Sequence, residues 1–267
     1  TENLMTSIFL SKKAKILEQL STPTQDYTDA SPKGSVDAPV QTLVKQINDI
    51  DSLVTTSSCS GRIAIYIEGA KIVSTEPENV GGASSVAKSS QGKGGGSWLF
   101  VSHTPLDDRF GEDASNSLFS QLLSSAQNES HVSVSPQMQT STDLHSATPP
   151  GARLLHFKFE PLILHILCSS LWAARKVLIA SQAAGFRESG ISSVPEPSIP
   201  IDTQDGHVMV AVRTTGLTMD APIGYLGEDD NIKLNVSDAY LGSLIKMGNQ
   251  RFATNEQRKQ RLRDGIM

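Results

Sequence analysis

The sequence predicts an α/β fold of the α+β type, in which a mixed central sheet is flanked by helices. Two observations support this fold class. Segments with apolar residues at helical spacing alternate along the chain with short segments whose apolar residues alternate or run together. No GxGxxG sequence follows a strand-like segment in the 267 residues, so a dinucleotide site of the Rossmann type has no support.

The first part of the chain contains two expected helices and one expected strand. Residues 5–20 carry apolar residues at helical spacing with lysines between them, which is typical of an amphipathic helix. Asp37 precedes a second apolar stripe that begins at Val40 and includes Ile47, and its side chain is suited to cap that helix. Residues 62–67 (RIAIYI) predict a strand, because isoleucine occupies every second position.

Five further segments predict strands, and they are separated by one expected helix. The five are short and rich in apolar residues, and they are residues 97–103, 154–159, 162–168, 186–192 and 207–213. Ser169 or Ser170 would cap the helix that follows the third of them, and Gly185 would end it. A final helix begins at Asp238 and continues into a polar, basic tail.

Two stretches predict flexible insertions within a single domain that spans residues 1–267. Residues 73–92 and 111–149 are rich in small and polar residues and lack apolar periodicity over most of their length. Their formal charges, −1 and −4, account for the whole net charge of −5, so the acidic balance does not argue against a nucleic-acid partner. Residues 117–125 differ, because their apolar residues have helical spacing and predict a short docking helix.

The composition also limits the class of protein and the kind of site. No apolar run reaches the roughly 18 residues that a membrane span needs, and no secretion signal is visible, so we expect a cytoplasmic protein without a membrane partner. The two cysteines cannot form a disulfide framework. The six histidines show no close ligand spacing, so we expect no metal. No GxSxG motif supports a serine hydrolase.

The densest polar segment is TTSSCSGR at residues 55–62, which predicts a turn between two apolar runs. Such a turn can present backbone N–H groups to a ligand, and Arg62 can bind a carboxylate or phosphate. The alternative is a connection whose hydroxyl groups bond only to their own backbone. Cys59 has no neighbouring base, so a structural or ligand-lining thiol is favoured over a nucleophile. Cys168 lies in an apolar segment and is expected in the core.

Other polar or aromatic side chains allow two interpretations each. Trp98 could stack on a base or pack in the core, and His103 could be a base, a ligand or neither. Lys158 and Glu160 stand among apolar residues and could simply pair with each other. The segment GFRESG at residues 185–190 could belong to a site or form a solvated corner.

Six segments, taken in order, resemble the tRNA wybutosine-synthesizing protein 3 family. They are DASPKGSVD (29–37), TTSSCSGRI (55–63), GGSWLFVSH (95–103), KFEPLILH (158–165), GFRESGI (185–191) and a tail with Asn249, Asn255 and Arg258. The resemblance spans most of the chain outside the two insertions. It implies a non-Rossmann methyltransferase that uses S-adenosylmethionine. The implied target is the N-4 ring nitrogen of the tricyclic wybutosine precursor next to the anticodon of phenylalanine tRNA.

The resemblance also implies where the reaction takes place. We expect the catalytic step to depend on Asp37, His103 and Arg62. Residues expected to bind the cofactor are Ser57, Ser58, Cys59, Ser60, Gly61, Arg62, Trp98, Ser102, His103, Glu160 and His165. Residues expected to bind the tRNA are Lys33, Lys158, Arg187 and Ser189. The basic residues near the C-terminus could contact phosphates or could form a solvated helix face.

Methyl transfer to a ring nitrogen requires close placement of the reacting atoms and a group that takes the proton. A carboxylate or His103 could serve, and no covalent adduct with Cys59 is needed. Substitution Arg62→Ala is expected to abolish methylation and leave the fold intact. Two alternatives remain open: a noncatalytic tRNA-binding protein that retains the family fold, and a hydrolase that depends on cysteine or serine.

Overall fold

The computed structural model describes residues 2–21, 36–69, 96–107, 117–126, 140–142, 147–193 and 207–267. Within these residues the chain forms five α-helices, one 3₁₀ helix and ten strands. Lys33 and the whole expected insertion 73–92 lie outside the described residues. None of the described helices is both long enough and apolar enough to cross a membrane.

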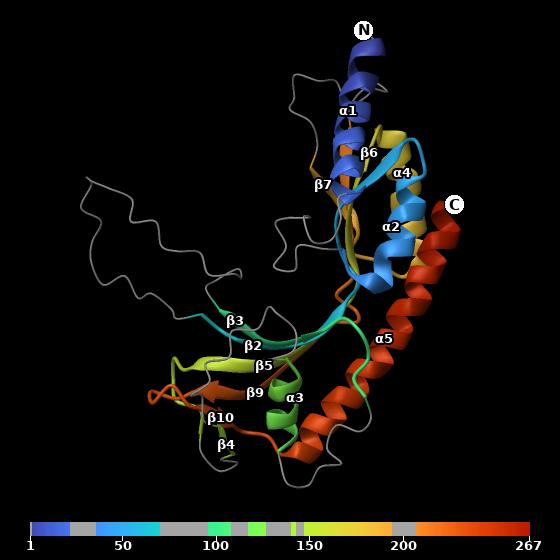
Figure 1. Ribbon diagram of the computed structural model, residues 1–267. Coiled ribbons are helices and arrows are strands. Elements are labelled where there is room, and N and C mark those ends of the chain that lie inside the picture. Colours follow the sequence, from blue (N-terminus) through green and yellow to red (C-terminus); the bar gives the residue numbers. More distant parts are fainter. Residues whose placement is uncertain are drawn as a thin grey trace, which may run out of the picture.

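One sheet has four antiparallel strands in the order β1-β6-β8-β7. Their bounds are Leu53–Cys59 (β1), Ile163–Cys168 (β6), Val208–Val212 (β8) and Gly190–Ser193 (β7). Helices α2 (Gln41–Asn48) and α4 (Leu171–Ala184) pack on one face and share an apolar core with it. Helix α1 (Glu2–Ser21) covers the opposite face, where Phe9 packs against Val54 and Leu167 (Figure 1).

The second sheet has six strands in the order β3-β2-β5-β9-β10-β4. Their bounds are Ser97–Ser102 (β3), Arg62–Ile67 (β2), Arg153–Glu160 (β5), Met219–Leu226 (β9), Ile232–Leu234 (β10) and Thr140–Thr142 (β4). This sheet is mixed, because β4 runs parallel to β10 while the other neighbours are antiparallel. Helices α3 (Leu118–Ala126) and α5 (Asp238–Ile266) pack on one of its faces.

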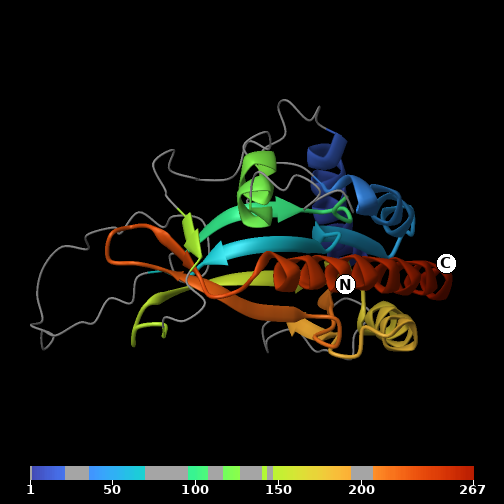
Figure 2. The same cartoon turned by 90° about the horizontal axis from the view of Figure 1, so that it is seen from below.

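Three chain connections and one helix join the sheets, and one of the connections is the loop of residues 213–218 between β8 and β9. Strand β1 continues into β2 through Ser60 and Gly61, and β5 continues into β6 through Pro161 and Leu162. Gly61 has φ +100°, and a Cβ there would lie 3.0 Å from Asn255 Nδ2, so this tight passage requires glycine. Helix α5 runs along both sheets and contributes residues to both cores (Figures 1 and 2).

The α+β fold class is confirmed, and the strands are distributed over two sheets that meet at these connections. The expected end signals of α4 are also confirmed. The Ser170 side chain accepts a hydrogen bond from Ala173 N, and Gly185 ends α4 with φ 100°. The docking helix expected at residues 117–125 forms as α3, and its Phe119 and Leu122 are fully buried.

Two local expectations about strands were wrong, and three strands were missed. Residues 55–59 belong to β1, because pairing with β6 makes a polar TTSSC segment into a strand. Residues 186–189 form a turn, and the strand begins only at Gly190. Strands β4, β9 and β10 were not expected. Pro222 and Gly224 interrupt the apolar pattern of β9, β10 has three residues, and β4 has three polar residues inside the expected insertion 111–149.

Candidate active site

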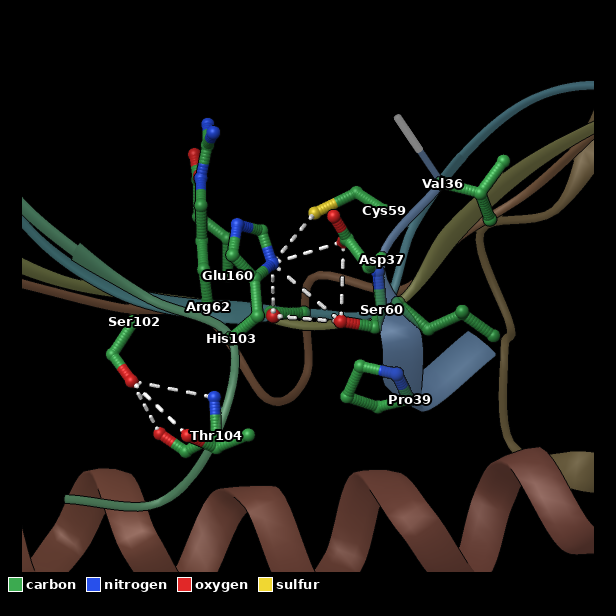
Figure 3. A network of polar contacts seen from close by, with 12 residues as sticks. Val36, Asp37, Pro39, Cys59, Ser60, Arg62, Ser102, His103, Thr104 and Glu160 are labelled. Carbon is green, nitrogen blue, oxygen red and sulfur yellow. Dashed lines mark hydrogen bonds and ion pairs between the residues drawn. The ribbon is translucent and has the colours of Figure 1, made fainter. Parts of the chain in front are cut away.

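Asp37 is the buried centre of a polar cluster at the junction of the two sheets. It precedes the 3₁₀ helix η1 (Ala38–Val40), but its side chain makes no capping hydrogen bond, so the expected cap was wrong. Instead Oδ2 accepts hydrogen bonds from Ser60 N at 2.8 Å and Ser60 Oγ at 3.2 Å. The same oxygen lies 2.9 Å from His103 Nδ1 (Figure 3). The carboxylate therefore connects the β1–β2 passage to the end of β3.

His103 directly follows β3 and offers one ring nitrogen for chemistry. Nδ1 lies 2.9 Å from Asp37 Oδ2 and 3.1 Å from Gly61 O, and both of these atoms are acceptors. Nδ1 must therefore carry a proton, and in the neutral imidazole the lone pair is on Nε2. Nε2 is buried and has no hydrogen-bond partner among the described residues. Asp37 and His103 thus form a dyad, and the Nε2 atom of His103 can accept a proton.

Cys59 lies beside this dyad as a neutral thiol. Its Sγ is 4.0 Å from His103 Nδ1. Burial raises the pKa of the thiol to about 11, and this effect outweighs the opposite influence of Arg62. A thiolate nucleophile at neutral pH is therefore disfavoured. The ligand atoms of Asp37, Cys59 and His103 lie within 4.8 Å of one another, a spacing that could hold a metal ion, so the expectation of no metal stays a prediction.

Arg62 and Glu160 form a cross-strand ion pair next to the dyad. Arg62 Nε donates to Glu160 Oε2 at 2.6 Å, and the two residues are direct partners on β2 and β5. The guanidinium carbon lies 4.2 Å from the centroid of the Trp98 ring. The bond uses only Nε, so the Nη groups can still donate to a carboxylate or phosphate. Lys158 binds Asp220 at 2.7 Å and does not pair with Glu160.

The structure brings together part of the predicted site. The residues that gather around the dyad are Asp37, Cys59, Ser60, Gly61, Arg62, Trp98, His103 and Glu160. Ser57 and His165 form a second pair on β1 and β6, with Oγ 2.8 Å from Nδ1, and Ser58 is half-buried between these two groups of residues. Ser102 Oγ donates to Thr104 O at 2.7 Å, which shapes the loop at the end of β3.

Arg187 and Ser189 lie apart from the dyad, in the turn between α4 and β7. Ser189 Oγ donates to Phe186 O at 2.7 Å within that turn. The third predicted tRNA ligand, Lys158, lies on β5 with its ammonium 5.5 Å from the centroid of the Tyr66 ring. The residues predicted to bind tRNA are therefore spread over two separate parts of the described structure.

Three polar side chains of α5 each hold a segment of the site but were not among the predicted site residues, although two of them, Asn249 and Asn255, belong to the tail that carries the resemblance. The Asn249 amide accepts from Leu106 N and donates to Leu106 O, both at 2.9 Å, just beyond His103. Asn255, 1% exposed, accepts from Leu162 N and donates to Ser60 O, again at 2.9 Å. Lys259 Nζ donates to Pro39 O at 3.1 Å, two residues after Asp37. The sequence could have indicated these residues, because they are polar side chains on the apolar side of a long helix.

Comparison with known proteins gives consistent matches over most of the chain. The sequence model of a family described as "Methyltransferase TYW3" matches residues 11–267. The tRNA wybutosine-synthesizing protein 3 of Schizosaccharomyces pombe is 31% identical over 97% of this chain and 86% of that protein. The Saccharomyces cerevisiae protein of the same name is 32% identical over 97% of this chain and 80% of that protein. The Arabidopsis thaliana tRNA wybutosine-synthesizing protein 2/3/4 is 32% identical over 94% of this chain but only 20% of that protein.

Two solved structures illustrate the likeness in fold. The PH1069 protein from Pyrococcus horikoshii superposes with a TM-score of 0.61 at 21% identity, covering 98% of both chains. A hypothetical protein from Aeropyrum pernix gives a TM-score of 0.50 at 19% identity, covering 86% of this chain and 97% of that one. These likenesses support the two-sheet fold.

Proposed function

Because the chain belongs to the TYW3 methyltransferase family and is therefore a tRNA methyltransferase of wybutosine biosynthesis, we propose that it methylates the N-4 ring nitrogen of the tricyclic base next to the anticodon of phenylalanine tRNA. The observation that carries the proposed site is the Asp37–His103 dyad with its unpartnered Nε2. The proposal treats residues 1–267 as one catalytic domain with insertions at 73–92 and 111–149. It also includes a cytoplasmic location.

The residues around the dyad fit S-adenosylmethionine, which methyltransferases use in general and which supplies an electrophilic methyl group when bound. Arg62 retains Nη donors for a carboxylate, and the Glu160 carboxylate is half-exposed and can attract an ammonium. Trp98 offers an aromatic surface beside them. We assign cofactor binding to Ser60, Gly61, Arg62, Trp98 and Glu160, with Ser57, Ser58, Cys59, Ser102 and His165 as further lining.

His103 would take the proton that the ring nitrogen loses when its lone pair forms the new bond to carbon. The buried Nε2 is the available acceptor, and Asp37 holds the proton of Nδ1 and stabilises the imidazolium that results. Arg62 would orient an anionic group of cofactor or substrate through its Nη groups. General-base catalysis of this kind contributes about 10²–10⁴-fold in rate.

Substitution His103→Gln tests this assignment. With labelled S-adenosylmethionine and tRNA from cells blocked at this step, we expect kcat to fall about 10²–10⁴-fold, because no base takes the proton. Cofactor affinity, measured by calorimetry, should change far less than kcat. His207→Gln is the matched control, since this histidine contacts Lys12 far from the dyad and should keep wild-type activity. Equal kcat in both variants would contradict the role of His103.

The same assay separates this function from its alternative. Arg62→Ala should abolish methylation while the circular dichroism spectrum stays that of the folded protein. Wild-type protein that binds the tRNA but neither binds the cofactor nor transfers label would instead be a noncatalytic tRNA-binding protein. Transfer of label to a different nucleotide would overturn the proposed target but keep the enzyme.

A further inference from the structure

Four arginines gather around the turn between α4 and β7, away from the dyad. Arg258 Nη1 donates to Gly185 O at 2.8 Å, and Arg261 Nη2 donates to Ala184 O at 3.1 Å. Arg213 Nε donates to Glu188 O at 3.2 Å. Arg187 belongs to the turn itself and is exposed. We call these four residues the arginine cluster; it is held by three backbone carbonyls of a single turn.

The charge of the arginine cluster is poorly balanced. Glu188 is the carboxylate of the turn, and its oxygens accept hydrogen bonds from Thr215 N and Thr215 Oγ1, each at 3.1 Å. The turn therefore has four guanidinium groups around it and one carboxylate, an excess of three positive charges. Within the described residues none of the four arginines forms an ion pair with an acidic side chain.

Crowding of like charges is visible in the electrostatics of Arg258. Burial lowers the pKa of this guanidinium, and the nearby charges of Arg261 and Arg187 lower it further. The protein keeps these groups close together although they repel each other. A bound anion would relieve the repulsion, because each opposite charge within a few ångströms favours the charged guanidinium.

The donor geometry favours phosphate groups. Each of Arg213, Arg258 and Arg261 has N–H groups beyond those that bond the turn, and Arg187 has no hydrogen bond to another described residue. Guanidinium groups bind phosphate oxygens through two parallel N–H bonds. Several such groups fixed on one turn suit the repeated phosphates of a nucleic-acid backbone better than a single carboxylate.

Helix α5 connects the arginine cluster to the active site. Asn255 holds Ser60 O at the dyad, and Arg258 and Arg261 follow it by about 4.5 and 9 Å along the helix axis. Figures 1 and 2 both show the end of α4 beside α5 in this region. A nucleic acid with one base at the dyad can therefore extend its backbone to the cluster.

We propose that the arginine cluster binds backbone phosphates of the tRNA near the nucleotide that is modified. This inference rests on the proposed function, since it takes tRNA as the substrate. It assigns to Arg187 and to the GFRESG turn an electrostatic role in holding the substrate.

Substitution Arg187→Ala tests the proposal, because this exposed side chain makes no bond that supports the turn. Binding of labelled tRNA is measured by fluorescence anisotropy over a series of salt concentrations. We expect weaker binding, and a slope of log K against log salt that falls in magnitude by about 0.7–0.9 for the lost phosphate contact. The KM for tRNA should rise by the same factor as Kd, and the Kd of the cofactor should not change.

Arg263→Ala is the matched control, because Arg263 lies on α5 but pairs with Asp264 at 3.2 Å. It should change tRNA affinity little and leave the salt slope unchanged. Identical slopes for Arg187→Ala, Arg263→Ala and the wild type would overturn the proposal. So would loss of binding to polyglutamate without loss of binding to tRNA, which would assign the cluster to an acidic protein partner. If the wild type binds tRNA with the expected slope but transfers no methyl group, the proposed function fails while the phosphate contact stands.

Discussion

Asp37 is a buried carboxylate that accepts two hydrogen bonds from Ser60 and faces the imidazole of His103. A charged group in this position is stable only because several donors converge on it. The sequence suggests the type of residue but not these partners. Asp37, Ser60 and His103 are distant along the chain. Pairing of β2 with β3 brings the segments of Ser60 and His103 together, and Asp37 arrives with η1, where Lys259 holds Pro39 O. The local sequence predicts that Asp37 caps a helix, but its carboxylate accepts buried hydrogen bonds from Ser60 and caps no helix.

Cys59 gives a pH-dependent prediction at this scale. Its pKa of about 11 lies above that of an ordinary thiol, so we expect alkylation by iodoacetamide to accelerate about tenfold per pH unit from 7 to 10. Mass spectrometry of the Cys59 peptide measures the rate. The raised pKa also means that the neutral thiol is favoured in the folded state. Its contribution to stability is therefore complete below about pH 9 and is lost as the pH rises through 11. An alkylation rate that levels off near pH 8.5 would contradict the raised pKa of Cys59.

Helix α5 is the element that organises the candidate site. Asn249, Asn255 and Lys259 reach three separate segments, those that carry His103, Ser60 and Asp37. Apolar side chains of the same helix fill both cores. The periodicity of the sequence predicts the start of this helix. It does not reveal which polar residues face inward, because their backbone partners come from distant parts of the chain.

Substitution Asn255→Ala tests this organising role. It leaves Leu162 N–H and Ser60 C=O without partners in a buried setting, and each unmet group costs about 1–3 kcal/mol. We expect a clear loss of stability in urea unfolding and a loss of methyl transfer. Asn235→Ala is the control, since its amide donates to the hydroxyl of Thr148 rather than to buried backbone, and should cost under about 1 kcal/mol. Similar stabilities for the two variants would show that α5 does not hold the β1–β2 passage.

Other elements show where local signals suffice and where they fail. Ser170 and Gly185 mark the ends of α4 correctly, because caps depend on neighbouring residues. Strand β9 escaped prediction because it contains Pro222, which sits at an irregularity in its pairing with β5. Strand β1 is polar and becomes a strand by pairing with β6. Tertiary pairing, which a single sequence does not display, decides these two cases.

At the scale of the whole molecule, two sheets share three chain connections and one helix. The sequence indicates the strands but not their division, because the order of strands depends on long-range pairing. The α3 segment also belongs to this scale. It lies within the expected insertion 111–149, at the position where a docking helix was predicted, and Phe119 and Leu122 complete the core of the six-stranded sheet. Deletion of the whole stretch would therefore remove core residues.

The shared connections predict that both sheets unfold together. The chain has two tryptophans, Trp98 on β3 and Trp172 at the start of α4, so each sheet carries its own fluorescent probe. Each of the variants Trp98→Phe and Trp172→Phe keeps one tryptophan. In each variant, the midpoint of urea unfolding measured by fluorescence should equal the midpoint measured by circular dichroism. The Trp172 signal should change because its ring leaves Lys176, whose ammonium lies 3.6 Å from the ring centroid. Fluorescence and circular dichroism that separate within either variant would mean that the sheets unfold independently.

Helix α5 follows Asp37, the β1–β2 passage and His103 in the chain, so the ribosome makes all of these segments before the helix that holds them. Until residues 255 and 259 have emerged, the carbonyl groups of Ser60 and Pro39 lack their partners. The apolar surface that Phe252 covers is also open to chaperones during this interval. A nascent chain that ends before α5 thus carries the dyad residues without their support, and translation of this helix sets the earliest moment at which the enzyme can act.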